Sequence, residues 1–204
     1  MSTHAKAAAK FLADRERAAW HDRALFHVRE KRDRMAHAVP EWEALRQAAS
    51  EIKLHTLSHL GRYLEEFERN ATANGMVVHW ASDAREMNRI VLDILRRHGG
   101  RTLIKSKSML SEECGLAPFL AGQGIDAVES DLGERIMQLM HRPPSHIVLP
   151  AIHVRREEVG ELFERELGTA RGDSDPTYLT HEARKHLRGK FLTADVAMTG
   201  GWEL

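Results

Sequence analysis

The stretch Arg101-Thr-Leu-Ile-Lys105-Ser-Lys-Ser108-Met-Leu-Ser-Glu-Glu113 holds three patterns in a row. The apolar and β-branched run from Thr102 to Ile104 predicts a strand. A polar loop with two lysines and two serines follows, and the glutamates after it are favoured in the first turn of a helix. A strand, a polar loop and a helix in this order can bind an anion at the carboxyl edge of an α/β sheet. An ordinary turn with solvated lysines has the same pattern, so both interpretations are open.

The rest of the sequence after residue 75 alternates between the periods of strands and helices. Besides the Thr102 run, strands are predicted at Met76–Trp80, Ile125–Glu129, Ser145–Leu149 and Ala194–Met198. Helices are predicted between them, at about 83–98, 109–120, 131–140, 154–167 and 176–190. This alternation predicts right-handed βαβ units, and therefore an α/β fold with a mostly parallel sheet.

The first third of the sequence has a helical pattern throughout. Residues 4–38 are rich in Ala, Arg, Glu and Lys and predict one long amphipathic helix that must lie on something. A second helix is predicted from Pro40 to Asn74, with apolar residues at three- and four-residue steps. We therefore predict a helical extension over residues 1–74 and an α/β domain over residues 75–204.

Composition limits the classes of partner. The 30 basic and 30 acidic residues give a formal charge of zero, which argues against a nucleic-acid or membrane-surface partner. No apolar run approaches the about 20 residues of a membrane span, and no secretory signal is recognisable. The one cysteine, Cys114, excludes an intramolecular disulfide and is too few to hold a metal cluster. We expect a cytoplasmic protein.

Few other residues suggest chemistry. The first predicted strand is followed by Trp80-Ala-Ser-Asp83, so a glycine-rich nucleotide loop is absent there. His55 and His59 share one helix face, but a third ligand and the glutamate of a zinc motif are missing, which favours ordinary histidines. His153 follows the predicted Ser145–Leu149 strand at the edge where α/β proteins bind ligands, and an ordinary loop histidine is the alternative.

Several short motifs, taken in order between about Ile52 and Gly200, resemble one family. The sequence is similar to the LUD domain of lactate-utilization iron–sulfur proteins of the B type. The similarity is carried by Ile104-Lys-Ser-Lys-Ser-Met109, Glu112-Glu113, Gly115-Leu116, Glu129-Ser-Asp-Leu-Gly-Glu134, Pro143-Pro-Ser-His-Ile147, Pro150-Ala-Ile-His153 and Ala194-Asp-Val-Ala-Met-Thr-Gly200.

This resemblance implies a fold like that of sugar-phosphate isomerases and CoA transferases. It also implies a cytoplasmic bacterial subunit that oxidises L-lactate to pyruvate together with two partner proteins. A small anionic ligand would then bind at Lys105, Ser106 and Ser108, with Glu113, His153, Thr199 and Gly200 nearby. No catalytic residue and no metal ligand is assigned.

The sequence also departs from the family pattern. Members of this type continue beyond the Thr-Gly motif into a ferredoxin-like half whose cysteines hold 4Fe–4S clusters. With one cysteine and three residues after Gly201, this chain is expected to hold no cofactor itself, to be a truncated N-terminal half and to be inactive alone.

Two other functions are open. The first is an enzyme of the sugar-phosphate isomerase or acyl-CoA transferase type, for which Glu113 is the nominated base or nucleophile. The second is a non-catalytic interaction fragment, in which the amphipathic N-terminal helices offer the binding surface.

Overall fold

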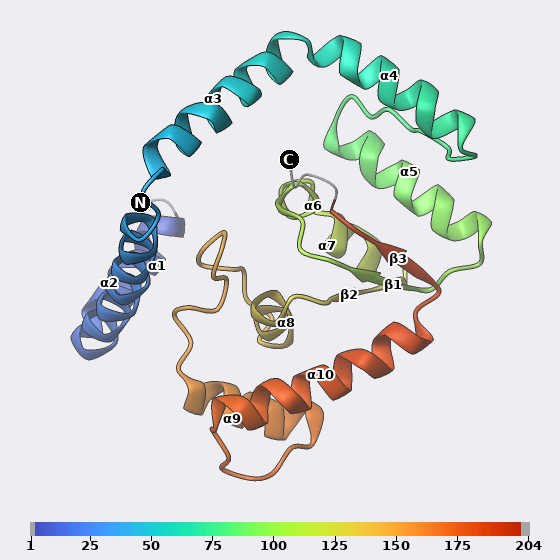
Figure 1. The fold of residues 1–204 in the computed structure, drawn as a ribbon. Helices are drawn as coiled ribbons and strands as arrows, with labels where there is room; N and C mark the ends of the chain where they lie inside the picture. Colours follow the sequence, from blue (N-terminus) through green and yellow to red (C-terminus); the bar gives the residue numbers. More distant parts are fainter. Residues whose placement is uncertain (1–2, 201–204) are drawn as a thin grey trace. The chain divides into compact units, whose positions relative to one another are not determined.

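The structure, a computed structural model, describes residues 3–200 (Figure 1). The chain divides into two compact units, residues 1–79 and residues 80–204. No helix within the described residues is both long and apolar enough to cross a membrane.

The described residues of the first unit form four helices: α1 (Thr3–Ala13), α2 (Arg15–His37), α3 (Trp42–Ser58) and α4 (Leu60–Ala73). Each of the two predicted long helices is thus broken in two. At the first break the Asp14 carboxylate accepts a hydrogen bond from the Arg17 N–H at 3.0 Å, so Asp14 begins a new helix as its N-cap. Before the second break, the hydroxyls of Thr56 and Ser58 bond to carbonyls one turn back, an arrangement that bends helices.

The apolar faces of α3 and α4 stay uncovered within this unit. Among its described residues, Ala71 is the only buried one. Leu45, Ile52 and Phe67 are 55%, 67% and 56% exposed. Within this unit, both helices therefore present apolar side chains that stay exposed.

The second unit is built on a three-stranded parallel sheet of β1 (Thr102–Lys105), β2 (Asp126–Glu129) and β3 (Val196–Met198). The strand order is β2-β1-β3. Lys105 is in register with Glu129 on one side and with Met198 on the other, so all three strands end at the same edge. The α/β class, the parallel sheet and three of the five predicted strands are confirmed.

Helices cover both faces of this sheet. They are α5 (Ala84–Arg97), α6 (Met109–Glu113), α7 (Leu116–Ala121), α8 (Leu132–Leu139), α9 (Arg156–Leu167) and α10 (Pro176–Thr193). Leu103 packs with residues of α5 and α7, whereas the next residue, Ile104, packs against Leu187 of α10. This alternation is the two-residue period of a strand buried on both faces. Each buried aliphatic side chain contributes about 1.5–3 kcal/mol.

A second apolar cluster joins the three helices after β2. Ile136 of α8, Phe163 of α9 and Leu179 of α10 are buried together, and Figure 1 shows α9 and α10 side by side. The predicted helix starts are confirmed where capping side chains are present. Asp83 accepts from the Glu86 N–H at 2.8 Å, and Asp131 accepts from the Glu134 N–H at 3.0 Å.

The strands predicted at Met76–Trp80 and Ser145–Leu149 are wrong. In the second segment, a side chain bonds to backbone N–H groups that pairing with another strand would need. His146 Nδ1 accepts from the N–H groups of Val148 and Leu149, each at 3.0 Å. Such local bonds compete with strand pairing. The first segment is irregular, and its Val77 is 77% exposed, so it gains little of the burial that favours a strand.

A side chain takes the place of a further strand beside β2. The Gln138 amide of α8 donates to the Ala127 carbonyl at 2.6 Å and accepts from the Glu129 N–H at 3.1 Å. A primary amide offers the same donor and acceptor as a peptide group, so it pairs with the strand as a neighbouring strand would. The outer edge of β2 is therefore satisfied near its carboxyl end without a fourth strand.

Candidate functional site

The polar loop after β1 is fixed by the end of β3 and by the start of α6. The Ser106 N–H donates to the Met198 carbonyl at 2.9 Å, and the Ser106 hydroxyl accepts from the Gly200 N–H at 2.8 Å. The Ser108 hydroxyl accepts from the Ser111 N–H at 3.3 Å and so acts as the N-cap of α6. Both serines therefore have structural hydrogen bonds as well as their predicted place at the sheet edge.

Lys105 is the centre of a buried charged cluster. Its side chain is 1% exposed, and its ammonium donates to both carboxylate oxygens of Glu129, at 2.8 and 2.7 Å. It also donates to Glu112 Oε1 of α6, at 3.3 Å. The register of the sheet explains the first pair, because Lys105 and Glu129 are the last residues of neighbouring parallel strands.

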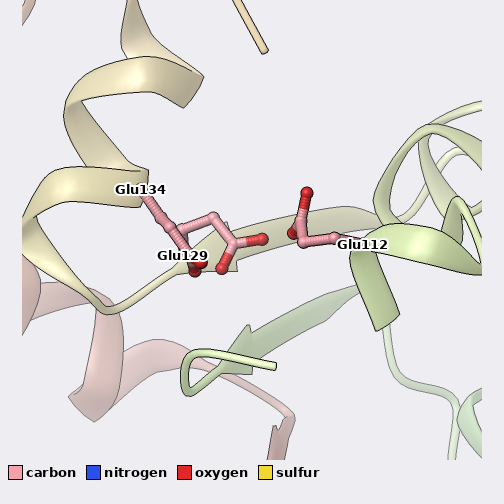
Figure 2. A group of neighbouring side chains, drawn as sticks. All are labelled: Glu112, Glu129 and Glu134. Atoms are coloured by element: carbon pink, nitrogen blue, oxygen red, sulfur yellow. The ribbon is translucent and has the colours of Figure 1, made fainter. Parts of the chain in front are cut away.

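A second, looser pair lies beside the first. Lys107 Nζ is 3.5 Å from Glu134 Oε1 of α8, and Glu134 is buried. Lys107 Nζ and Glu134 Oε2 are both buried atoms without a hydrogen-bond partner within the described residues. Figure 2 shows the carboxylates of Glu112, Glu129 and Glu134 directed toward one another from α6, β2 and α8. The cluster, which we call the carboxyl-edge cluster, consists of these three glutamates, Lys105 and Lys107.

Burial dominates the titration of Glu129. Loss of water around the carboxylate raises its pKa to about 8, and the nearby carboxylates of Glu112 and Glu134 act in the same direction. The Lys105 ammonium opposes this shift by hydrogen bonding and by its charge. Glu129 is therefore a carboxylic acid that gains and loses its proton near neutral pH, which is the property of a general acid or base.

The three glutamates do not form a metal site as they stand. Their oxygens lie within 4.8 Å of one another, and carboxylate oxygens are the ligands that Mg²⁺ and Ca²⁺ prefer. However, the Lys105 ammonium already contacts two of the three carboxylates and would repel a second cation. The Lys105 ammonium thus takes the place that a metal ion would have among these carboxylates.

A cavity of about 930 Å³ begins at the cluster and runs along the outer edge of β2. Glu112, Glu129 and Glu134 line one part of it, and Arg135 and Gln138 of α8 line another. Arg135 donates to Gln138 Oε1 at 2.5 Å and lies 3.2 Å from His186 Nε2. Burial lowers the pKa of Arg135, whereas the negative charges of Asp126 and Glu129 oppose this change. The cavity therefore offers both acidic and basic groups to a small molecule.

The predicted site residues are only partly brought together. Ser106 and Gly200 are hydrogen bonded, and Lys105 lies at the same strand edge. Glu113 and Thr199 are exposed, and Glu112 rather than Glu113 contacts Lys105. His153 is buried and its Nδ1 lies 2.6 Å from the Ser145 hydroxyl.

Sequence reasoning did not single out Glu129 and Glu134 as members of the site. The signal that could have found Glu129 is its place as the last residue of a predicted parallel strand, like Lys105. Glu134 follows at the third position of the next helix, after the N-cap Asp131.

The remaining histidine and cysteine candidates have ordinary contacts. His55 Nε2 lies 3.0 Å from the Tyr63 hydroxyl, and His59 Nδ1 lies 2.8 Å from the His55 carbonyl oxygen. Cys114 is a half-buried free thiol. One cysteine in the whole sequence does not fit a cluster that needs four thiolate ligands, so the residues of this chain cannot ligate a 4Fe–4S cluster by themselves.

The LUD domain family matches residues 64–201. Lactate utilization protein B of an Exiguobacterium species is 42% identical over 173 residues, which are 85% of this chain and 36% of that protein. Lactate utilization protein B of Bacillus subtilis is 37% identical over 174 residues, 85% of this chain and 36% of the relative.

An uncharacterized electron transport protein of Escherichia coli, YkgF, is 37% identical over 169 residues, 83% of this chain and 35% of the relative. No solved structure matches the chain. The chain spans about a third of the length of these relatives. With most of the α/β unit, including the whole carboxyl-edge cluster, inside the matched residues 64–201, the chain belongs to the LUD domain family.

Proposed function

We propose that this chain is the LUD-domain part of an electron-transfer protein of L-lactate utilization. In this role it works in the cytoplasm with two partner proteins that together oxidise lactate to pyruvate. The observation that supports the proposal is the similarity to relatives named for lactate utilization over 85% of the chain. Iron–sulfur clusters, if the assembly uses them, are held by other polypeptide segments, because this chain offers one cysteine.

A hybrid protein tests this role directly. In a Bacillus subtilis strain whose growth on L-lactate depends on lactate utilization protein B, the matching 174-residue segment is replaced by the corresponding part of this chain. We expect the hybrid to restore growth on L-lactate, whereas the relative with that segment deleted does not. A hybrid that accumulates to the level of the intact relative and still fails to support growth contradicts the proposal.

At the residue level, we propose that the loop after β1 binds the carboxylate of a small anionic ligand at the carboxyl edge of the sheet. Ser106, Ser108, Thr199 and Gly200 form the wall of this site in the proposal, with His153 and Glu113 nearby. Lys105 contributes through its charge, since its ammonium already contacts Glu112 and Glu129. Lys107 is the better direct donor, because its buried Nζ lacks a hydrogen-bond partner within the described residues.

Calorimetric titration with L-lactate and pyruvate tests the loop. Lys107→Gln removes this ammonium, and we expect it to weaken binding by about tenfold, the usual effect of losing one charged hydrogen bond. Lys185→Gln is the control, because that lysine is exposed and pairs with Glu182 of its own helix. Equal affinity of the wild type and Lys107→Gln for both ligands would refute the anion role of the loop.

One observation favours an enzyme of the sugar-phosphate isomerase or acyl-CoA transferase type as a second candidate. Glu129 is a buried carboxyl group whose pKa is raised to about 8, and it borders a cavity. Glu129 therefore replaces Glu113 as the nominated acid–base group of that alternative. Turnover of a sugar phosphate or a CoA ester that Glu129→Gln abolishes would support it, and a panel of such substrates without turnover would exclude it.

A further inference from the structure

A second surface cavity, of about 460 Å³, lies at the opposite edge of the sheet. It is lined by the residues just before β1, namely Arg96, Gly99, Gly100 and Arg101, and by those just before β2, from Gln123 to Ile125. β1 and β2 are parallel, so both begin at this edge and end at the carboxyl-edge cluster. A strand advances about 3.3 Å per residue, which separates the cavity from the cluster by about 10 Å along β1. The amino-edge cavity and the carboxyl-edge cluster are therefore different sites.

The charged lining of this cavity is entirely basic. Arg96 Nη2 donates to Gln123 Oε1 at 2.8 Å, which fixes that guanidinium at the wall and leaves its other N–H groups available. The Arg101 guanidinium has no hydrogen bond or ion pair with any residue from 3 to 200. None of the lining residues is acidic.

The carboxylate of Asp195, which bonds to the backbone at this edge, already has hydrogen-bond partners. Asp195 Oδ2 accepts from the N–H groups of Arg101 and Thr102, at 2.8 and 2.9 Å, and from the Thr102 hydroxyl at 2.8 Å. These bonds, together with the positive charge of Arg101, lower the pKa of Asp195. Asp195 therefore fixes the backbone at the start of β1. Its carboxylate has these hydrogen-bond partners without pairing with the Arg101 guanidinium.

Two of the glycines that line the cavity have open space where a side chain would lie. Gly99 and Gly124 have φ values of +64° and +75°, and a Cβ atom added to either would meet nothing within 4 Å. Their backbone N–H groups are paired with Arg96 and Ala121 carbonyls, at 3.1 and 3.0 Å, and so do not bind a ligand. Recognition at this cavity consequently depends on the two guanidinium groups, whose planar forks match the oxygens of carboxylates and phosphates.

We propose that this amino-edge cavity is a binding site for a small oxyanion, either a phosphate or a carboxylate group, held between Arg96 and Arg101. The site is independent of the proposed role in lactate utilization and of the loop after β1.

Nuclear magnetic resonance of the full chain tests the proposal during titration with inorganic phosphate and, separately, with acetate. We expect the amide signals of Gly99, Arg101 and Gly124 to shift in a saturable manner with at least one of the two anions. Which of them saturates identifies the class of ligand. Sodium chloride at matched ionic strength is the reference and should give no saturable shift.

Two variants decide whether the guanidinium groups are responsible. Arg96→Gln and Arg101→Gln should each weaken the affinity by about tenfold, the effect expected for one lost charged hydrogen bond. Arg97→Gln removes the same charge from the same helix, but Arg97 bonds to the Asp93 carbonyl and does not line the cavity. It should leave the affinity within about twofold. An equal loss in Arg97→Gln, or no saturable shift with either anion, would overturn the proposal.

Discussion

Lys105 and Glu129 form a pair in which one partner titrates near neutral pH, and this property governs what its disruption costs. Above the Glu129 pKa of about 8, the carboxylate is charged and buried, and the ammonium is its main partner. Removing one partner of a buried ion pair leaves an uncompensated charge and typically costs about 3–5 kcal/mol. Lys105 lowers the Glu129 pKa, so without it the pKa lies higher, and below that higher pKa the lone acid stays neutral and the cost is smaller.

We therefore expect Lys105→Met to lower the free energy of unfolding by about 3–5 kcal/mol above the pKa that Glu129 has in this variant, and by less below it. Urea unfolding at one pH on each side of the pKa measures both values. Lys185→Met, at an exposed surface pair, should change stability by about 0.5 kcal/mol or less at either pH. A Lys105→Met variant no less stable than this control at both pH values would mean that the buried pair is not formed.

Glu129 also sets a pH dependence of stability. Its pKa is about 8 in the folded protein against about 4.3 for an ordinary glutamate, so the folded state holds a proton that the unfolded state releases between these values. The contribution is fully present below about pH 4.3 and is lost as the pH rises to about 8. The free energy of unfolding should fall by at most about 1.4 kcal/mol per pH unit in this window.

Glu129→Gln removes this titration, since an amide does not ionise. Between about pH 5 and about pH 8, the free energy of unfolding of the variant should change less with pH than that of the wild type. If the free energy of unfolding changed equally with pH in the two proteins, the Glu129 pKa would not differ between the folded and unfolded states.

Among the elements, α9 makes one unusually close approach. A Cβ atom at Gly160 would lie 2.5 Å from the Asp173 carbonyl oxygen, which belongs to the loop before α10. Gly160→Ala must push this backbone away and should cost about 1–3 kcal/mol. Gly189, inside α10, has nothing within 4 Å of its Cβ position, so Gly189→Ala should stabilise by about 0.5–1 kcal/mol. Thermal unfolding of both variants tests whether the two signs are opposite, and a stabilising Gly160→Ala would contradict the packing.

The elements also show where sequence reasoning succeeds and where it stops. Capping residues such as Asp83 act through bonds to residues three positions away, so their patterns are visible in the sequence. The strand predicted at Ser145–Leu149 fails because His146 satisfies the local N–H groups. Gln138 then covers the edge of β2 that such a strand could have joined. Apolar alternation alone does not reveal either bond.

The same limit applies to the site. The position of Lys105 at a strand end follows from the local pattern of apolar and polar residues. Its partner Glu129 depends on the strand order β2-β1-β3, which brings two distant strand ends together. Without the topology, the sequence predicts that a lysine lies at the sheet edge. It does not predict that the ammonium of this lysine is paired with a buried carboxylate.

At the scale of the whole molecule, the feature with consequences in solution is the apolar surface that α3 and α4 leave exposed within the first unit. On α4, Leu60, Leu64 and Phe67 lie at three- and four-residue steps, and on α3 Leu45 and Ile52 are a full two turns apart. All five are exposed. Exposed apolar side chains that repeat along a helix face mark a region that binds something, and moving each such side chain out of water gains up to about 1.5–3 kcal/mol.

We therefore expect the chain to self-associate as its concentration rises, or else to bind a hydrophobic fluorescent dye strongly. Ile52→Lys combined with Phe67→Lys places two charges on this face and should suppress both effects, because each charge must stay in water. Leu12→Lys is the matched control: Leu12 is 66% exposed but belongs to α1 rather than to α3 or α4. Light scattering and dye fluorescence measure the response. A wild-type monomer without dye binding, or equal suppression by Leu12→Lys, would show that the α3 and α4 face is not a binding surface. Association that only the double variant abolishes would instead support the interaction-fragment hypothesis for the helical part of the chain, while leaving the chemistry of the sheet edge to be tested separately.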